Sequence, residues 1–145
     1  MTQTERRLYL IAALLKEQPQ FSKIEIPCDK QEQKRLLRSL FNIRMPKPVT
    51  EEFLMVQDAY LKEEIKRKGI TALSDLEPVS KEIYLWRGDI TTLKCDAIVN
   101  AANSQMLGCF CPNHGCIDNV IHTFAGVQLR LACRDLMKQQ GHEEE

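Results

Sequence analysis

The sequence predicts an α/β protein in which a helical part precedes a part that contains strands. Apolar residues recur with helical spacing in the first 80 residues, whereas continuous β-branched and aromatic runs follow Lys81. The chain has 145 residues, of which 43% are hydrophobic and 28% charged, enough for one ordinary domain or two small ones. We therefore expect two units, residues 1–80 and residues 81–145.

The first expected helix lies near the N-terminus and should end before Pro19. Its apolar residues recur at positions i, i+3, i+4 and i+7, which places them on one helical face. The four residues are Leu8, Ile11, Ala12 and Leu15.

Two more helices are expected before residue 70. Asp29 and Glu32 form a D-x-x-E pattern typical of a capping box, and the apolar positions 36, 37, 40 and 41 follow it before Pro46. Thr50 is a suitable N-cap for the third helix, and Gly69 is a suitable residue just beyond its end. No motif in this half indicates chemistry, so we interpret it as a helical extension that packs on the rest.

Strands are expected after residue 80. Ile83–Trp86 and Asp96–Asn100 are continuous apolar runs of strand length, and the short segment Ile90–Lys94 between them has room for one helical turn. A single long helix with a broad apolar face is expected over Ile117–Gln140.

Polar residues follow both expected strands, where an α/β sheet binds its ligands. They are Asp89 and the segment 100–103. Asp118 lies near the start of the last helix, where free backbone N–H groups stabilise a carboxylate. Its side chain is also suited to accept such N–H groups as the N-cap of that helix. His122 lies four residues later on the same face, and we interpret it as structural support.

Composition excludes some classes of function. The formal net charge is zero, which argues against a protein held to nucleic acid by electrostatics. No apolar run approaches the roughly 20 residues that span a membrane. The six cysteines do not form an evenly spaced framework, and a signal peptide is not evident, so we expect a cytoplasmic protein with reduced thiols.

One dense cluster of cysteine and histidine stands out. The stretch GCFCPNHGCIDN, Gly108–Asn119, carries Cys109, Cys111, His114 and Cys116 within eight positions. The cluster is a candidate metal site, a candidate redox pair or a buried turn. Clustered thiols and imidazole in a reducing compartment favour metal binding, and the cramped C-x-C spacing disfavours a disulfide.

Two longer motifs resemble a known family. RGDITTLKCDAIVNAAN, Arg87–Asn103, resembles the opening of a macrodomain, and CIDNVIHTFAG, Cys116–Gly126, resembles the helix that follows its glycine-rich loop. The Cys/His cluster stands in place of the usual glycines. In this respect the chain is similar to the zinc-containing macrodomain protein-ADP-ribose hydrolases of bacteria and fungi, which also carry an N-terminal helical extension.

The resemblance implies a fold and a set of binding residues. The fold is the three-layer α/β/α sandwich, here incomplete, with residues 81–145 as the N-terminal part of a zinc-binding macrodomain. Asp89 would accept a hydrogen bond from the adenine amino group, with Ile90 beside it. Asn103 would face the distal ribose, Asp118 would lie next to the scissile bond, and Asn119 would adjoin it. From the residues alone, a turn after Gly88 is the favoured interpretation of Asp89, and a turn at a strand end explains Asn103 equally well.

The resemblance also implies the metal ligands. The pattern C-x4-H-x-C assigns one Zn²⁺ to Cys109, His114 and Cys116. Three protein ligands leave tetrahedral zinc with an open position, as in catalytic sites. Cys111 would complete four ligands, but Pro112 constrains the backbone after it and the family pattern leaves this position free.

The implied function is a zinc-dependent hydrolase that removes mono-ADP-ribose from a modified protein, with Asp118 and Asn103 as catalytic residues. The substrate protein implied is a lipoyl-carrier protein. The alternatives are a non-enzymatic ADP-ribose-binding module and a zinc-stabilised interaction fragment. Macrodomains place a second glycine-rich loop and further strands later in the chain, so we expect this chain to be an incomplete form that is inactive alone.

Overall fold

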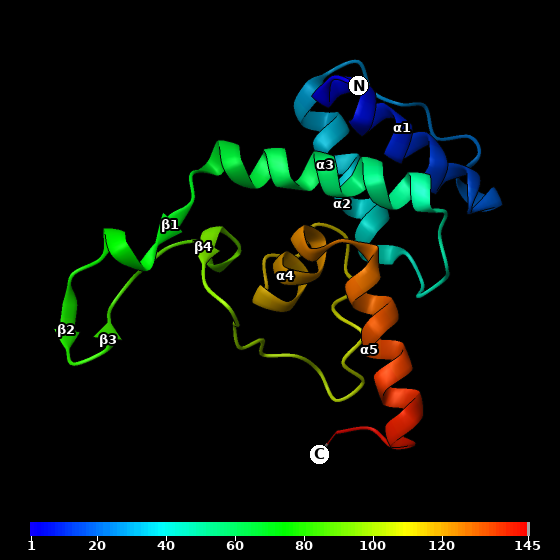
Figure 1. Ribbon diagram of the computed structural model, residues 1–145. Coiled ribbons are helices and arrows are strands. Elements are labelled where there is room, and N and C mark those ends of the chain that lie inside the picture. The colour runs from blue at the N-terminus through cyan, green and yellow to red at the C-terminus, as the bar shows by residue number, and fades with distance from the viewer. Residues whose placement is uncertain (145) are drawn as a thin grey trace.

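Residues 1–144 are described by a computed structural model in which five α-helices dominate (Figure 1). Helices α1, α2 and α3 form a bundle at the N-terminal end, and α4 and α5 pack against it from the other side of α2 and α3. Their bounds are Gln3–Lys16 for α1, Lys30–Ile43 for α2, Glu51–Lys68 for α3, Ile117–Ala125 for α4 and Val127–Gln140 for α5.

The three expected N-terminal helices are confirmed, and side chains at their ends fix where they begin and stop. Thr2 caps α1 in a complete capping box with Glu5. Asp29 accepts the backbone N–H groups of residues 31 and 32 at the start of α2. Thr50 caps α3, and Gly69 ends it with a φ of 91°, a conformation that favours glycine.

One hydrophobic core joins the early and late helices. It contains Leu10 and Leu14 of α1, Leu37 of α2 and Tyr60 of α3, together with Val127 at the start of α5. Burying a large apolar side chain contributes about 1.5–3 kcal/mol relative to leaving it exposed, so this cluster is the main source of stability. Helix α5 therefore shares the core of the N-terminal helices.

The buried face of α1 differs from the expected one. The face that packs inward is formed by Gln3, Arg7, Leu10, Ile11 and Leu14. Arg7 is buried because its Nε donates a hydrogen bond of 2.9 Å to Oε1 of Gln33 in α2. Two polar residues thus belong to the inward stripe, and a pattern based on apolar residues alone misplaces the face by about one residue.

The single helix expected over residues 117–140 is wrong, because Gly126 divides it into α4 and α5. Gly126 has a φ of 84°. A Cβ at this position would lie 2.4 Å from Nε2 of Gln57, a fully buried residue of α3. Oε1 of Gln57 in turn accepts the backbone N–H of Val127 at 2.9 Å. The close approach of α3 and this capping bond together require the break.

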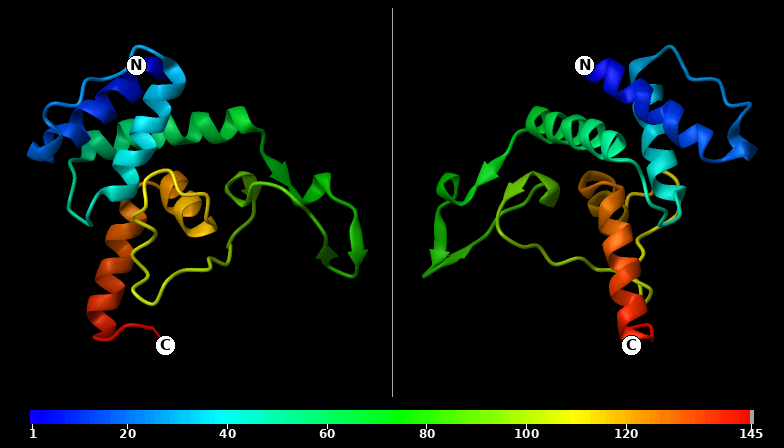
Figure 2. Two further views of the ribbon diagram at one scale, coloured as in Figure 1. Left: turned by 180° about the vertical axis from the view of Figure 1, so that it is seen from behind. Right: turned by 45° about the vertical axis from the view of Figure 1, so that its right-hand side comes forward.

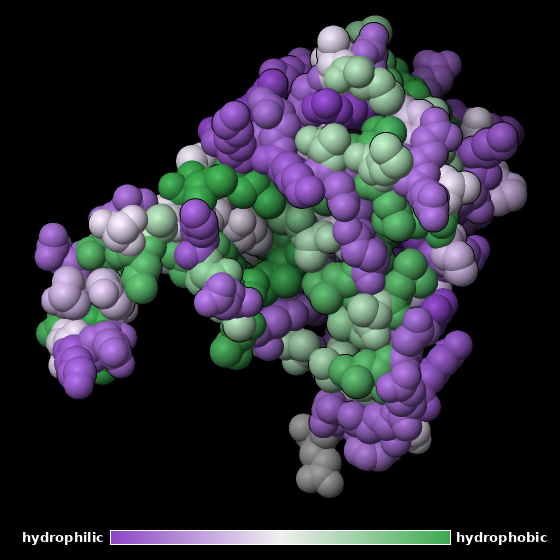
Figure 3. Space-filling view, viewed as in Figure 1, coloured by the Kyte–Doolittle hydropathy of each residue, from purple (hydrophilic) through white to green (hydrophobic). Residues whose placement is uncertain are grey.

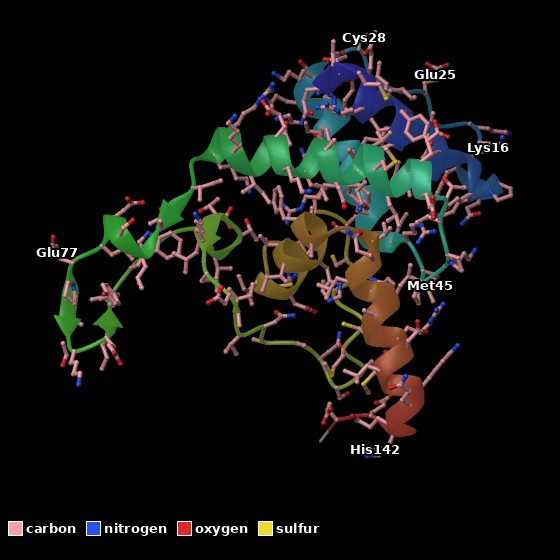
Figure 4. The ribbon with its side chains drawn as sticks, viewed as in Figure 1. Lys16, Glu25, Cys28, Met45, Glu77 and His142 are labelled. Carbon is pink, nitrogen blue, oxygen red and sulfur yellow. The ribbon has the colours of Figure 1, made fainter. Side chains whose placement is uncertain are left out.

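An extended arm, residues 70–107, leaves the helices after α3, and its far end carries β2 and β3. Strand β1 (Thr71–Ala72) pairs in parallel with β4 (Leu93–Lys94), and β2 (Pro78–Ser80) pairs antiparallel with β3 (Ile83–Tyr84). Three short 3-10 turns lie at η1 (Pro19–Phe21), η2 (Leu73–Asp75) and η3 (Ile90–Thr92). The arm projects away from the bundle in every view (Figure 2), and Glu77 lies on it far from Met45, which lies near the top of α5 (Figure 4).

The strand expected over Asp96–Asn100 does not form, and the strand expected over Ile83–Trp86 forms only at its first two residues. Val99 is 89% exposed and Leu85 is 81% exposed. A strand needs hydrogen-bonded neighbours, and within these two segments only Ile83–Tyr84 has one among the described residues, in β2. Hydrophobic side chains accordingly gather at the surface between α3 and the arm (Figure 3).

The predicted α/β class with a helical N-terminal part is confirmed. Within residues 1–144 the sheets have two strands each, so the layered sandwich implied by the resemblance is not assembled in this part. The expected helical turn within residues 90–94 is confirmed as η3. Among the described helices, none is both long and apolar enough to cross a membrane. The division at residue 80 stays a prediction.

Candidate functional site

The three candidate ligands converge at the start of α4. The ligand atoms of Cys109, His114 and Cys116 all lie within 4.8 Å of one another, and Cys109 Sγ is 3.6 Å from His114 Nδ1. Zinc–sulfur and zinc–nitrogen bonds of ordinary length in a tetrahedron separate the two ligand atoms by roughly 3.6 Å. The donor set therefore fits a zinc ion, and it is a possible metal-binding group.

Cys111 lies outside this group. It is exposed, and its contribution to the loop comes from its backbone. Its carbonyl oxygen accepts a hydrogen bond of 2.9 Å from Asn119 Nδ2 and one of 3.2 Å from the backbone N–H of His114. This arrangement agrees with a site of three protein ligands and an open fourth position.

Helix α4 presents the last candidate ligand and Asp118 together. Cys116 is the N-cap of α4, and its Sγ accepts the backbone N–H of Asn119 at 3.4 Å. Asp118 therefore lies in the first turn of α4 rather than at its cap. The helix dipole still stabilises a carboxylate in the first turn. The candidate metal group and the candidate acid are two residues apart in the chain.

Asp118 is nearly inaccessible and has two polar side chains beside it. Its Oδ1 accepts a hydrogen bond of 2.8 Å from Asn100 Nδ2 and lies 3.6 Å from Nε2 of His122. Burial lowers the pKa of His122, and Arg130 lowers it further, while the Asp118 carboxylate opposes both effects. A lowered pKa favours neutral His122 at pH 7, and its ring packs beside Asp118.

The loop that carries the candidate ligands, residues 108–116, is called the Cys/His loop or ligand loop. Its first residue packs directly on His122. Gly108 has a φ of 81°, and a Cβ there would lie 2.7 Å from Cγ of the His122 ring. Arg130 of α5 fixes the same end of the loop, because its Nε donates to the Leu107 carbonyl at 2.7 Å and its guanidinium lies over the Phe110 ring at 4.2 Å. Only a glycine permits this close approach.

Asn119 holds the loop rather than facing a cavity. It is fully buried, and its Nδ2 donates to the carbonyls of Cys111 at 2.9 Å and of Cys109 at 3.4 Å. Its Oδ1 accepts a hydrogen bond of 3.0 Å from Nη2 of Arg38 in α2. The amide thus has partners on both sides, and its role in the structure is to shape the ligand loop.

Asn103 lies apart from Asp118 in its contacts. It is exposed, its Nδ2 donates to the Gly108 carbonyl at 3.2 Å, and its Oδ1 accepts the backbone N–H of Gln105. The asparagine that touches Asp118 is Asn100, the first of the two in the NAAN segment. Asn103 is therefore an exposed neighbour of Gly108, the first residue of the ligand loop.

Asp89 caps η3 and pairs with α3. Its Oδ2 accepts a hydrogen bond of 2.8 Å from Lys68, and its Oδ1 accepts the backbone N–H and the hydroxyl of Thr91. Burial raises the pKa of Asp89, but the hydrogen bonds from Lys68 and Thr91 outweigh burial and hold it below its ordinary value. Asp89 is thus ionised and is suited to accept a hydrogen bond from a ligand.

Two open clefts meet at Phe124, near the end of α4. One, of about 360 Å³, is lined by Arg38, Lys68 and Asp89 among others. The other, of about 260 Å³, is lined by Ile90. Both clefts extend along α4 toward its start, because Val120 lines the first and Ile121 lines the second. Asp89 and Ile90 therefore line clefts that run beside α4, the helix that begins directly after Cys116.

Sequence reasoning missed the residues of α2 that contact the ligand loop. Arg38 Nη2 donates to the His114 carbonyl at 2.7 Å, and Asn42 Oδ1 accepts the backbone N–H of Asn113 at 2.9 Å. Asn42 is 1% exposed. Its signal in the sequence is a polar residue directly after the apolar pair at positions 40 and 41, which an apolar pattern alone discards.

The chain is similar to known proteins over nearly its whole length. Residues 99–144 match the Macro domain family. A "Protein-ADP-ribose hydrolase" of Treponema medium is 60% identical over an alignment of 148 positions, which covers 99% of this chain and 57% of that protein. One of Staphylococcus aureus (strain MRSA252) is 48% identical over 137 residues, 94% of this chain and 51% of that protein. The chain thus resembles proteins named protein-ADP-ribose hydrolase and spans about half of their length.

Proposed function

We propose that a protein containing this chain together with the remaining length of its relatives is a zinc-dependent protein-ADP-ribose hydrolase. The observation that carries the proposal is the convergence of Cys109, His114 and Cys116 two residues before the buried Asp118. The names of the relatives support the reaction class. Residues 81–145 would then be the N-terminal part of the macrodomain, and residues 1–80 its helical extension.

Zinc is the metal that best fits this donor set, because two thiolates and one imidazole are typical zinc ligands. When bound with an open position, zinc lowers the pKa of a water or hydroxyl ligand. Two thiolates donate negative charge and make this effect weaker than in a site of three histidines. The side chains of this chain must therefore orient the reacting groups to a large extent.

Asp118 is the proposed base. A carboxylate beside the scissile bond orients or deprotonates the attacking water, and its hydrogen bond from Asn100 fixes the direction of one oxygen. We assign Asn103 to the distal ribose, since an amide donates to and accepts from a diol. Asn119 acts through the shape of the loop.

Asp89 and Ile90 are proposed to bind the adenine end of the ligand. Asp89 is ionised and accessible enough to accept the adenine amino group. In the present arrangement Lys68 occupies one of its oxygens, so a bound base must share the carboxylate with Lys68 or displace it.

The proposed substrate is a mono-ADP-ribosylated protein, and we keep a lipoyl-carrier protein as the candidate. Binding through two cysteines requires reduced thiols, which a cytoplasmic location provides. A reader that binds ADP-ribose without cleaving it is the second candidate function, and the exposed Asn103 and the partly exposed Asp89 suit it. Zinc with an open position favours the hydrolase.

Metal analysis of cysteine variants tests the zinc site. We expect one zinc per chain, lost in Cys116→Ser and retained in Cys111→Ser, because only the former removes a member of the converging group. The measurement is zinc stoichiometry after gel filtration. Equal loss of zinc in both variants contradicts the ligand assignment.

Release of ADP-ribose from a modified protein tests the reaction. In the longer protein, Asp118→Ala should lower the rate by about 10²–10⁴-fold with a smaller change in ADP-ribose affinity, because loss of a general base removes transition-state stabilisation. Turnover equal to wild type would leave Asp118 as a helix-stabilising residue. ADP-ribose binding without any release in the wild-type protein would favour the reader.

A further inference from the structure

The candidate ligand loop is fastened to helix α2, which lies outside the motifs of the site. Three consecutive contacts join them. Arg38 Nη2 donates to the His114 carbonyl at 2.7 Å, Asn113 Nδ2 donates to Ser39 Oγ at 2.6 Å, and the Asn113 backbone N–H donates to Asn42 Oδ1 at 2.9 Å. Because α2 is a regular helix packed in the core, it offers a rigid template for an irregular segment.

These contacts fix the backbone on both sides of the candidate histidine ligand. Asn113 has a φ of 55°, a conformation that a non-glycine residue adopts at a cost. Its N–H is held by Asn42, and the carbonyl of the next residue, His114, is held by Arg38. The peptide group before Asn113 and the one after His114 are thus both anchored, which constrains the backbone that carries the imidazole.

Arg38 also connects the histidine to both cysteines. The same Nη2 atom donates to Asn119 Oδ1 at 3.0 Å. The Asn119 amide donates to the Cys109 carbonyl, and the Asn119 backbone N–H donates to Cys116 Sγ. One guanidinium nitrogen is therefore bonded directly to His114 and is linked through Asn119 to Cys109 and Cys116.

Packing alone explains poorly why an arginine stands at position 38. Nε of Arg38 is buried and has no hydrogen-bond partner among the described residues. A buried donor without a partner lowers stability, so an arginine selected for stability would be a poor choice here. Its Nη2 donates to the His114 carbonyl of the ligand loop and to Asn119 Oδ1.

We propose that Arg38 and Asn42 are positioning residues for the metal ligands, so that the helical part of the chain sets the metal affinity of the Cys/His loop. The inference rests on the proposed zinc site. Residues that orient metal ligands from outside the coordination sphere typically contribute 10–100-fold in metal affinity. The helical part is on this view a component of the metal site as well as a packing partner.

The test compares zinc affinities of variants in the 145-residue chain by competition with a chromophoric chelator. Arg38→Ala and Asn42→Ala should each bind zinc about 10–100-fold more weakly than wild type. Arg38→Lys should be intermediate, because an ammonium keeps the charge and some donors but not the fork geometry. Arg35→Ala, an exposed arginine of the same helix, is the matched control and should bind as wild type.

A second readout separates positioning from general stability. In the zinc-free protein, the thiols of Cys109 and Cys116 should react faster with a disulfide reagent in Arg38→Ala than in Arg35→Ala, with a similar melting temperature. A melting temperature lowered in parallel with zinc affinity, and thiol rates unchanged, would overturn the proposal.

The outcomes distinguish this inference from the zinc site itself. If wild type binds no zinc, the proposed metal site is wrong. If wild type binds zinc and Arg38→Ala binds it within twofold, the metal site stands and the positioning role is wrong. If Arg38→Ala does not fold by circular dichroism, Arg38→Lys and Ser39→Ala carry the test, and wild-type affinity in both overturns the proposal.

Discussion

Large apolar side chains are buried in the helical region and exposed in the arm. In the helical region Leu10, Ile11 and Leu14 are fully buried, whereas in the segment 70–107 Leu85 and Val99 are more than 80% exposed. A helix closes its backbone hydrogen bonds within one segment and needs only a packing partner. A strand needs neighbours along its edges as well, and the arm's strands have one neighbour each.

This difference divides the candidate site. The metal group is carried by a loop that α2, α4 and α5 hold at several points, so its geometry depends on the well-packed region. Asp89 and Asn103 lie on the arm side, where one is paired with Lys68 and the other is exposed. We therefore expect metal binding to be the more robust property of this chain and ligand binding the more dependent on further structure.

The largest contrast is expected in the free energy of unfolding. Leu10→Ala should lower it by about 2–5 kcal/mol, because it removes buried methyl groups and leaves a cavity in the shared core. Val99→Ala should change it by less than about 0.5 kcal/mol, since this side chain is 89% exposed. Urea unfolding monitored by circular dichroism measures both. Similar losses in the two variants would show that the arm is packed in solution.

A smaller contrast is expected between two glycines of the ligand loop. Gly108→Ala should destabilise the chain by at least about 1–2 kcal/mol, because its φ is 81° and the new Cβ would meet the His122 ring at 2.7 Å. Gly115→Ala is the control, since a Cβ there meets nothing within 4 Å. The measurement is again the free energy of unfolding, in zinc-free protein. Equal stability of the two variants would mean that the loop does not pack on His122.

The helices could be predicted from the sequence because their signals are local. Asp29, Thr50 and Gly69 mark helix ends through contacts within a few residues, and each was placed correctly. The break at Gly126 could not be predicted in this way. It depends on Gln57, 69 positions earlier in the chain, whose side chain lies where a Cβ would be.

The candidate site was predictable in its residue types and less so in its contacts. The spacing of Cys109, His114 and Cys116 indicated a metal group, and their ligand atoms do converge. Arg38 was missed because it acts on His114, a partner distant in sequence. Asn100 belongs to the segment expected near a ligand, but its contact with Asp118 was not foreseen for the same reason. A pattern search weighs residues near the motif, whereas a fold brings polar residues to it from any segment.

The smallest contrast concerns acid stability. Burial raises the pKa of Glu64 in α3, but hydrogen bonds from Lys34 and Gln3 outweigh it and hold the pKa below its ordinary value of 4.5. A carboxyl group with a lowered pKa in the folded state stabilises the fold above its unfolded pKa, and this contribution is lost as the pH falls through the folded value. Asp89 on the arm side is shifted in the same direction from 3.8.

Glu64→Gln should therefore reduce the loss of stability between pH 7 and pH 3, and Asp89→Asn should reduce it less. The Glu64 side chain is 13% exposed, whereas Lys68 and Asp89 are each 36% exposed, so solvent screens the second pair more strongly. Urea unfolding of both variants and the wild type at the two pH values provides the measurement. A larger effect from Asp89→Asn would reverse the comparison and would mean that the arm contributes as much to stability as the helices do.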